Sequence, residues 1–156
     1  MKKLLAVIIV VLFVLPSLLF AEQEGKRWGI GVNYPGLSLK CELDAKQTLE
    51  LKAQFGEDIL VVGPRYYHNF RSKGKTNLFF GEEADYLTFK GDGSEGSGFV
   101  IAVFVGGEYF TTPNFAVSLD IGPAYISLKD KDTNEDEGGI DFIANLGLTY
   151  YFGGEK

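Results

Sequence analysis

The chain has 156 residues, with 15 Lys and Arg against 21 Asp and Glu, and a formal net charge of −6. This length is typical of a single domain. The acidic surplus argues against nucleic acid as a partner, because phosphates require a basic protein face. The single cysteine, Cys41, cannot form an internal disulfide, and we expect it to be a small apolar residue on a strand.

Residues 1–21 have the pattern of a cleaved secretory signal peptide. Lys2 and Lys3 form a basic start, an almost wholly apolar run covers residues 4–20, and Ala21 precedes Glu22. Cleavage removes two lysines and no acids, so a mature domain of residues 22–156 has 13 basic and 21 acidic residues and a net charge of −8. The alternative is an uncleaved membrane anchor, since the run reaches the lower limit of a spanning helix.

From Trp28 onwards, apolar and polar residues alternate with period two, which predicts strands. The first run covers residues 28–34 and the second 37–43. Pro35-Gly36 interrupts them and the apolar parity shifts there, so the interruption is either a tight hairpin or a bulge. Further strands are expected at 48–55, 59–70, 76–89, 99–109, 115–128 and 140–152, separated by turns or loops at 44–47, 56–58, 71–75, 91–97, 111–114 and 129–139.

The last run, residues 140–152, alternates throughout its thirteen residues. Its apolar face carries Ile140, Phe142, Ala144, Leu146, Leu148, Tyr150 and Phe152, and its other face is largely polar or small. A tilted strand needs about 9 to 11 residues to cross a bilayer. The length and the aromatic end therefore predict the closing strand of a membrane barrel.

The fold class that we expect is all-β: a single antiparallel up-and-down transmembrane barrel. Eight strands are favoured over seven, because single-chain bacterial outer-membrane barrels have even strand numbers. With both termini in the periplasm, the loops at 90–97 and 129–139 lie outside the cell and the turn at 112–114 lies inside. The first two strands, of about seven residues each, are short for a full crossing.

If the apolar faces meet lipid, the charged faces point into the barrel. The predicted interior residues are Lys40, Glu42, Glu50, Lys52, Arg65, Asp120, Asp141 and Asn145, together with Glu83, Asp85 and Glu108. An eight-stranded barrel is filled by side chains, so we expect these residues to form an ionic network rather than an ion or proton pathway. Glu82 conflicts with this scheme, because its parity places it toward lipid unless it lies near the rim or a bulge intervenes.

The signal peptide, the alternating strands, the glycine-aromatic endings and the terminal TYYF (149–152) resemble the small outer-membrane β-barrel domain family, which includes OmpA-like and OmpX-like barrels. The resemblance covers the whole mature chain as a pattern. It implies a bacterial outer-membrane location and assembly through the terminal aromatic residue. Here Phe152 is followed by four more residues, so that signal is displaced from the end of the chain.

The sequence gives little sign of catalysis, and we predict no enzyme activity and no catalytic, metal or cofactor residues. His68 is the only histidine, and its neighbours Tyr66 and Phe70 favour an interfacial aromatic belt. The spacing of Asp130, Asp132, Asn134, Asp136 and Asp141 is similar to a calcium loop, but Glu135 replaces the turn glycine and Asp141 replaces the bidentate glutamate. A solvated acidic loop is the favoured interpretation.

The leading hypothesis is a monomeric, non-enzymatic outer-membrane barrel in contact with membrane lipid. Its role would be structural or interactive, with the acidic loops at 90–97 and 129–139 meeting extracellular or envelope partners. A porin-like narrow channel and a lipid-modifying enzyme are alternatives. A further alternative is a soluble lipocalin-like periplasmic barrel with its apolar faces inward, since alternation alone does not distinguish inside from outside.

Overall fold

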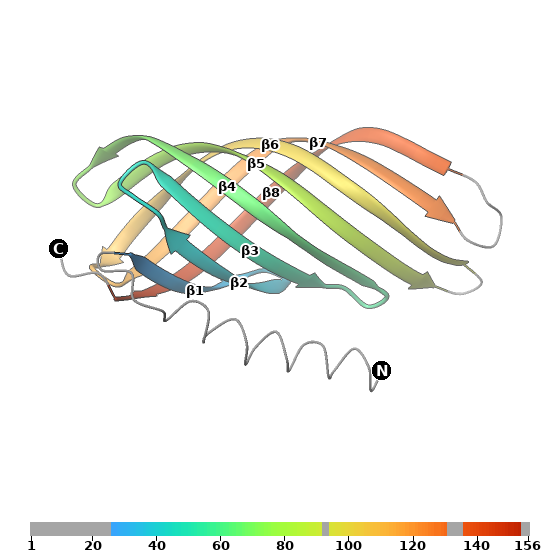
Figure 1. Cartoon of the computed structure of the whole chain (residues 1–156), viewed down its shortest axis with the longest axis horizontal. Helices are drawn as coiled ribbons and strands as arrows, with labels where there is room; N and C mark the ends of the chain where they lie inside the picture. Colours follow the sequence, from blue (N-terminus) through green and yellow to red (C-terminus); the bar gives the residue numbers. More distant parts are fainter. Residues whose placement is uncertain (1–25, 92–93, 131–135, 154–156) are drawn as a thin grey trace.

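The computed structural model describes residues 26–91, 94–130 and 136–153, and these form one closed barrel of eight strands (Figure 1). Each strand pairs antiparallel with its sequence neighbours, and β1 pairs with β8 to close the ring. The strands are β1 Arg27–Asn33, β2 Gly36–Glu42, β3 Gln47–Phe55, β4 Ile59–Lys73, β5 Thr76–Gly91, β6 Ser94–Thr112, β7 Phe115–Asp130 and β8 Asp136–Phe152. The all-β, up-and-down architecture is confirmed.

Pro35-Gly36 belongs to a hairpin rather than a bulge. Asn33 pairs with Gly36, and the two flanking strands run antiparallel over seven residues each. The strand count is therefore eight, as the even-number argument favoured. The expected signal peptide, residues 1–21, lies outside the described residues.

The two ends of the barrel differ. Arg27 and Phe152 lie at one end, which we call the terminal end; the opposite end, with the β5–β6 and β7–β8 hairpins, is called the outer end. The β1–β2 hairpin stops early, whereas β5 to β8 have 16 to 19 residues each and continue well beyond it (Figure 1). Residues 136–146 of β8 pair with β7, and no described residue pairs with their other edge. The wall is thus notched above Tyr34 and Pro35.

Three predicted loops are shorter than expected. β6 already begins at Ser94 and Thr88 pairs with Ser97, so most of the segment 90–97 is ladder rather than loop. Lys129 pairs with Asp136 in the same way, which shortens the loop at 129–139, and β4 extends to Lys73. The glycine-rich and charged composition of these segments predicted loops. They form strands because hydrogen-bond pairing with the neighbouring strands stabilises them where their local strand propensity is weak. Residues 92–93 and 131–135 lie outside the described residues.

The outer wall carries the apolar face that the alternation predicted. Exposed large apolar side chains occur on every strand, including Ile30 (57%), Val103 (57%), Ile121 (53%), Phe142 (70%) and Leu146 (56%). The alternate residues point inward and are buried, among them Asn145 (8%) and Tyr151 (1%) of β8. Within the described residues, no helix has the length and apolar character needed to cross a membrane.

Glu82 faces outward with the apolar residues, as its parity required. Its carboxylate lies 3.3 Å from His68 Nε2 on the neighbouring strand. The irregularity that could have moved it lies elsewhere, between Asn69 and Arg71, where Phe70 is the extra residue. The possibility that a bulge turns Glu82 inward was therefore wrong.

Candidate functional site

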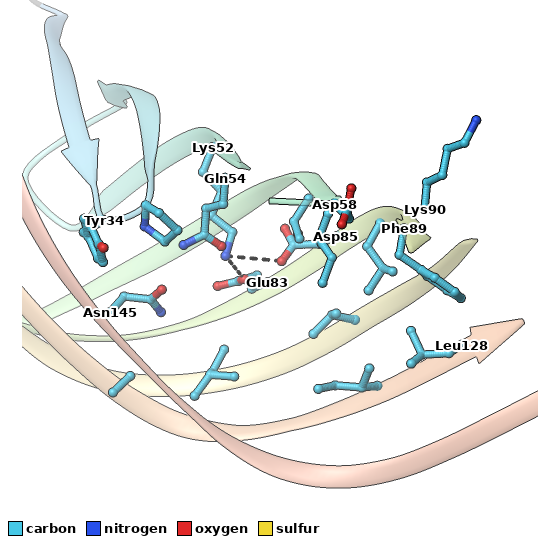
Figure 2. Close-up of a pocket in the computed structure, with 18 of the residues that line it drawn as sticks. Tyr34, Lys52, Gln54, Asp58, Glu83, Asp85, Phe89, Lys90, Leu128 and Asn145 are labelled. Carbon is cyan, nitrogen blue, oxygen red and sulfur yellow. Dashed lines mark hydrogen bonds and ion pairs between the residues drawn. The ribbon is translucent and has the colours of Figure 1, made fainter. Parts of the chain in front are cut away.

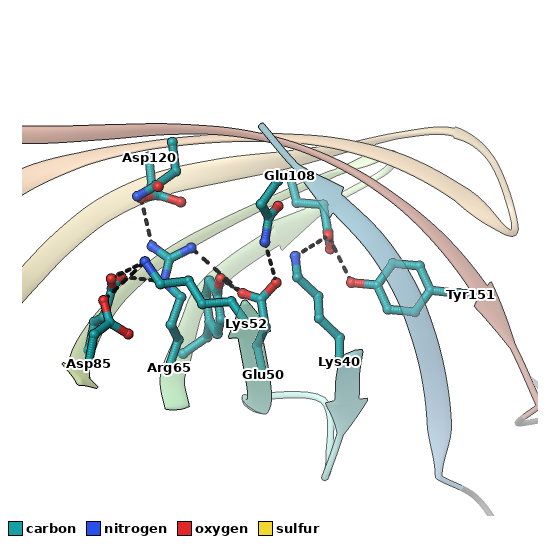
Figure 3. A network of polar contacts seen from close by, with 12 residues as sticks. Lys40, Glu50, Lys52, Arg65, Asp85, Glu108, Asp120 and Tyr151 are labelled. Atoms are coloured by element: carbon teal, nitrogen blue, oxygen red, sulfur yellow. Dashed lines mark hydrogen bonds and ion pairs between the residues drawn. The ribbon is translucent and has the colours of Figure 1, made fainter. Parts of the chain in front are cut away.

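Charged side chains fill the barrel interior, and the buried cations among the described residues are Arg27, Lys40, Lys52 and Arg65. Arg65, which is 2% exposed, lies within ion-pair distance of three carboxylates: Glu83 at 2.7 Å, Asp120 at 2.7 Å and Glu50 at 3.6 Å (Figure 3). Because these acids come from β3, β5 and β7, a single guanidinium connects strands across the lumen. The predicted ionic network is confirmed, with Arg65 at its centre.

The two lysines extend the network toward both ends. Lys52 on β3 contacts Glu83 and lies 3.2 Å from Asp85, both on β5. Lys40 on β2 lies 3.3 Å from Glu108 on β6. We call these eight residues the interior network: Lys40, Lys52, Arg65, Glu50, Glu83, Asp85, Glu108 and Asp120. Five carboxylates against three cations give it a formal charge of −2.

Neutral side chains complete the hydrogen bonding of these carboxylates. Asn33 donates to Glu50 at 2.8 Å and Asn145 donates to Asp120 at 2.9 Å. Two tyrosine hydroxyls also donate, from Tyr67 to Glu50 and from Tyr151 to Glu108, the latter at 2.8 Å. Tyr67 and Tyr151 were not predicted to take part in this network, although their parity matches that of Arg65 and Asn145.

Aromatic rings close the space beside the network. Tyr67, Phe79 and Phe104 form an edge-to-face cluster, with ring centroids 5.0 to 6.2 Å apart. The Arg65 guanidinium lies 4.0 Å from the centroid of Phe104, within cation–π range. Near the terminal end, Arg27 lies over the Tyr151 ring at 4.6 Å. Arg65 and Arg27 are thus packed against aromatic rings inside the barrel.

Two predicted interior acids differ from the rest. Asp141 points inward by parity but is exposed, because β8 continues past the network to the outer end. Glu42 lies 3.7 Å from Arg27 near the terminal end, and its side chain is 24% exposed. Both were expected in one continuous ionic interior. The inward parity of Asp141 is as predicted, but Asp141 lies outside the interior network, because alternation gives the direction of a side chain and not its height in the barrel.

Above the interior network, the lumen becomes apolar and opens into a cavity of about 730 Å³, here called the outer cavity (Figure 2). Its apolar wall comes from the inner faces of β5 to β8 and includes Leu87, Phe89, Val100, Ile126, Leu128 and Ile143. Lys52, Glu83, Asp85 and Asn145 line its polar side. The sequence signal for this cavity was present but unused: Val100-Ile101 and Phe142-Ile143 place apolar residues on both faces of a strand.

His68 faces outward, away from the interior network. Its ring stacks on Phe80, with centroids 4.7 Å apart, and meets the edge of Tyr66 at 4.7 Å. This is the aromatic surrounding that the sequence predicted. Within the described residues, no cluster of His, Cys, Asp or Glu has the arrangement of a metal site. Asp132 and Asn134 of the calcium-like pattern lie outside the described residues.

An apolar outer wall around a charged and filled interior defines a small transmembrane β-barrel. In a soluble barrel the apolar residues would fill the interior and the charges would face water. Here the arrangement is reversed along most of the wall. Where the ring is closed, including β1 against residues 147–152 of β8, hydrogen-bond pairing between strands satisfies the backbone groups that lipid cannot.

Comparison with solved structures agrees with this class. Neisserial surface protein A (NspA) matches with a TM-score of 0.50 and 12% identity, over 81% of this chain and 91% of that chain. The N-terminal β-barrel domain of Pseudomonas aeruginosa OprF matches with a TM-score of 0.55 and 14% identity, over 81% and 95%. No protein-family model and no curated protein sequence matches. At these identities the likeness concerns the fold, and it confirms the resemblance to small OmpA-like and OmpX-like barrels at that level.

Proposed function

We propose that the chain is a non-enzymatic barrel of the bacterial outer membrane that anchors an acidic outer end at the cell surface. The filled interior is the observation that carries this proposal. The interior network and the Tyr67, Phe79 and Phe104 rings occupy the cross-section, and a second cavity, among Lys40, Tyr67 and Glu108, has only about 10 Å³. Such a volume holds about one water molecule.

The interior supports a structural role more than conduction. A pore requires a continuous water column, and the charges here are held by one another instead. The narrow-channel alternative predicts conductance that changes when a lumen charge is removed. The outward position of His68 likewise gives no support to the enzyme alternative, since its contacts are Tyr66, Phe80 and Glu82.

Conductance of the purified barrel in planar phosphatidylcholine bilayers tests this proposal. We expect no discrete current steps, because the interior network blocks the lumen. The variant Asp120→Asn should be equally silent, and Glu57→Gln at the exposed outer end serves as its control. Steps of constant size from the unmodified protein, altered by Asp120→Asn and not by Glu57→Gln, would show a channel and overturn the proposal.

The surface role requires the outer end to face the outside of the cell. Exposed acids at that end include Glu57, Asp58, Glu95, Glu137 and Asp141. We propose that this acidic end meets extracellular or envelope partners. The proposal includes cleavage after residue 21, a mature domain of residues 22–156 and a monomeric state.

Labelling of intact cells measures this orientation. In a Cys41→Ser background, Lys129→Cys places a thiol at the outer end and Lys46→Cys places one in the turn between β2 and β3 at the terminal end. A membrane-impermeant maleimide should label Lys129→Cys on intact cells and Lys46→Cys only after lysis. The opposite pattern would mean that the barrel is inserted with its acidic end in the periplasm.

A further inference from the structure

The outer cavity is large enough for a ligand and is built with two kinds of wall. Its volume of about 730 Å³ lies within the range of about 300 to 1,000 Å³ that is typical of small-molecule sites. One wall is a contiguous apolar surface from β5 to β8, where Leu87 and Val100 are packed with Phe89, Ile126, Leu128 and Ile143. The interior network supplies the polar side.

The cavity is open where the barrel wall is lowest. Its lining includes Tyr34, which is 84% exposed, and Pro35, at the tip of the short β1–β2 hairpin. It also includes Ala144, which belongs to the outward face of β8 at the edge that no described residue pairs. The cavity therefore reaches the notch in the wall, and a chain can enter it there without crossing a strand.

The charges near the cavity restrict the headgroup of a ligand. The interior network has a formal charge of −2, and all three of its cations already contact carboxylates. At the rim, Asp58 and Lys90 both line the cavity, and Lys90 lies 4.0 Å from Glu95, so these three residues have a formal charge of −1. An anionic headgroup would meet a net negative surface, whereas a zwitterionic or cationic headgroup would not.

We propose that the outer cavity binds one single-chain amphiphile, whose alkyl chain lies on the β5–β8 wall and whose headgroup at the rim carries no net negative charge. The chain enters through the notch above Tyr34 and Pro35. The inference goes beyond the proposed anchoring role, and it needs only the folded barrel in a bilayer. Apolar surface that would otherwise be wet provides the driving force.

Quenching of engineered tryptophans by brominated lysophospholipids tests the proposal. In a Trp28→Phe background, Leu128→Trp reports from the cavity and Ser127→Trp reports from the outward side at the same height. The two full-length mature barrels are placed in phosphatidylcholine nanodiscs. Lysophosphatidylcholine and lysophosphatidylglycerol with the same brominated chain are then added, and heat-dependent gel mobility verifies that each variant is folded.

We expect the Leu128→Trp signal to be quenched saturably by a few mole percent of lysophosphatidylcholine. Ser127→Trp should be quenched only in proportion to the bulk quencher. Lysophosphatidylglycerol should be weaker by about fivefold, the effect of about 1 kcal/mol of charge repulsion. If Leu128→Trp does not fold, Ile126→Trp is the deeper cavity reporter and Tyr125→Trp is its outward match.

Two results would overturn the proposal. Equal, unsaturable quenching of the inward and outward reporters would show that the cavity takes no chain. Saturable quenching of the inward reporter in which lysophosphatidylglycerol equals or exceeds lysophosphatidylcholine would contradict the assigned headgroup. Neither result depends on surface partners or conductance, so failure here is distinguishable from failure of the proposed function.

Discussion

Replacement of Arg65 by methionine is expected to lower the free energy of unfolding by about 3 to 5 kcal/mol, because it leaves buried carboxylates without their cation. Glu50, Glu83 and Asp120 all lie within 3.6 Å of the guanidinium, and none is more than 3% exposed. Urea unfolding in phosphatidylcholine vesicles, followed by Trp28 fluorescence, measures the change.

The control is Arg71→Met on the same strand, where the side chain is exposed and lies beyond the bulge at Phe70. Its effect should stay within about 0.5 kcal/mol. Adding Glu83→Gln to Arg65→Met should recover part of the loss, since one unpaired charge is removed. Equal losses from Arg65→Met and Arg71→Met would show that the interior network does not stabilise the barrel.

Replacement of Ile121 by lysine is expected to cost about 2 to 4 kcal/mol, the penalty for a lysine near the middle of a lipid-facing wall. Ile121 is 53% exposed on the outer face of β7, opposite Val105 and Ala144. The same vesicle unfolding assay applies. The reason is that the ammonium group loses its water in hydrocarbon. The residues opposite it, Val105 and Ala144, offer no carboxylate to offset this loss. The cost is smaller if the lysine side chain reaches the interface.

Ser127→Lys is the matched control, since it lies on the same face of β7, two residues before the natural Lys129 at the outer end. The penalty for lysine falls to about 0 to 1 kcal/mol near an interface. A cost at Ser127 as large as that at Ile121 would mean that depth in the bilayer does not matter. Negligible costs at both positions would mean that the outer face of β7 does not lie in hydrocarbon.

Alternation predicted the strands and the facing of most residues, because one lipid-facing and one lumen-facing side leave a period of two in every strand. The predicted last strand, 140–152, differs from β8 only at its start. Prediction failed where composition and pairing disagree. Ser94 and Gly96 look like loop residues, yet they extend β6 because β5 is there to pair with them.

The candidate sites were predictable only in part. Parity indicated that Arg65 and the acids share the lumen. It did not indicate that three carboxylates from separate strands converge on one guanidinium, because that convergence depends on the stagger of the strands around the barrel. The outer cavity was missed altogether. Its residues, such as Val100 and Ile143, look like ordinary strand residues, and the cavity arises from the height difference between the β1–β2 hairpin and β5–β8.

The central claim is that this chain is an inserted outer-membrane barrel with its apolar face in lipid. Fractionation of expressing cells, with boiled and unboiled membrane fractions compared on a detergent gel, tests it most directly. We expect the protein in the outer-membrane fraction, with a mobility that changes on heating because the closed barrel resists detergent until boiled. A soluble periplasmic protein with no heat-dependent mobility would contradict the account.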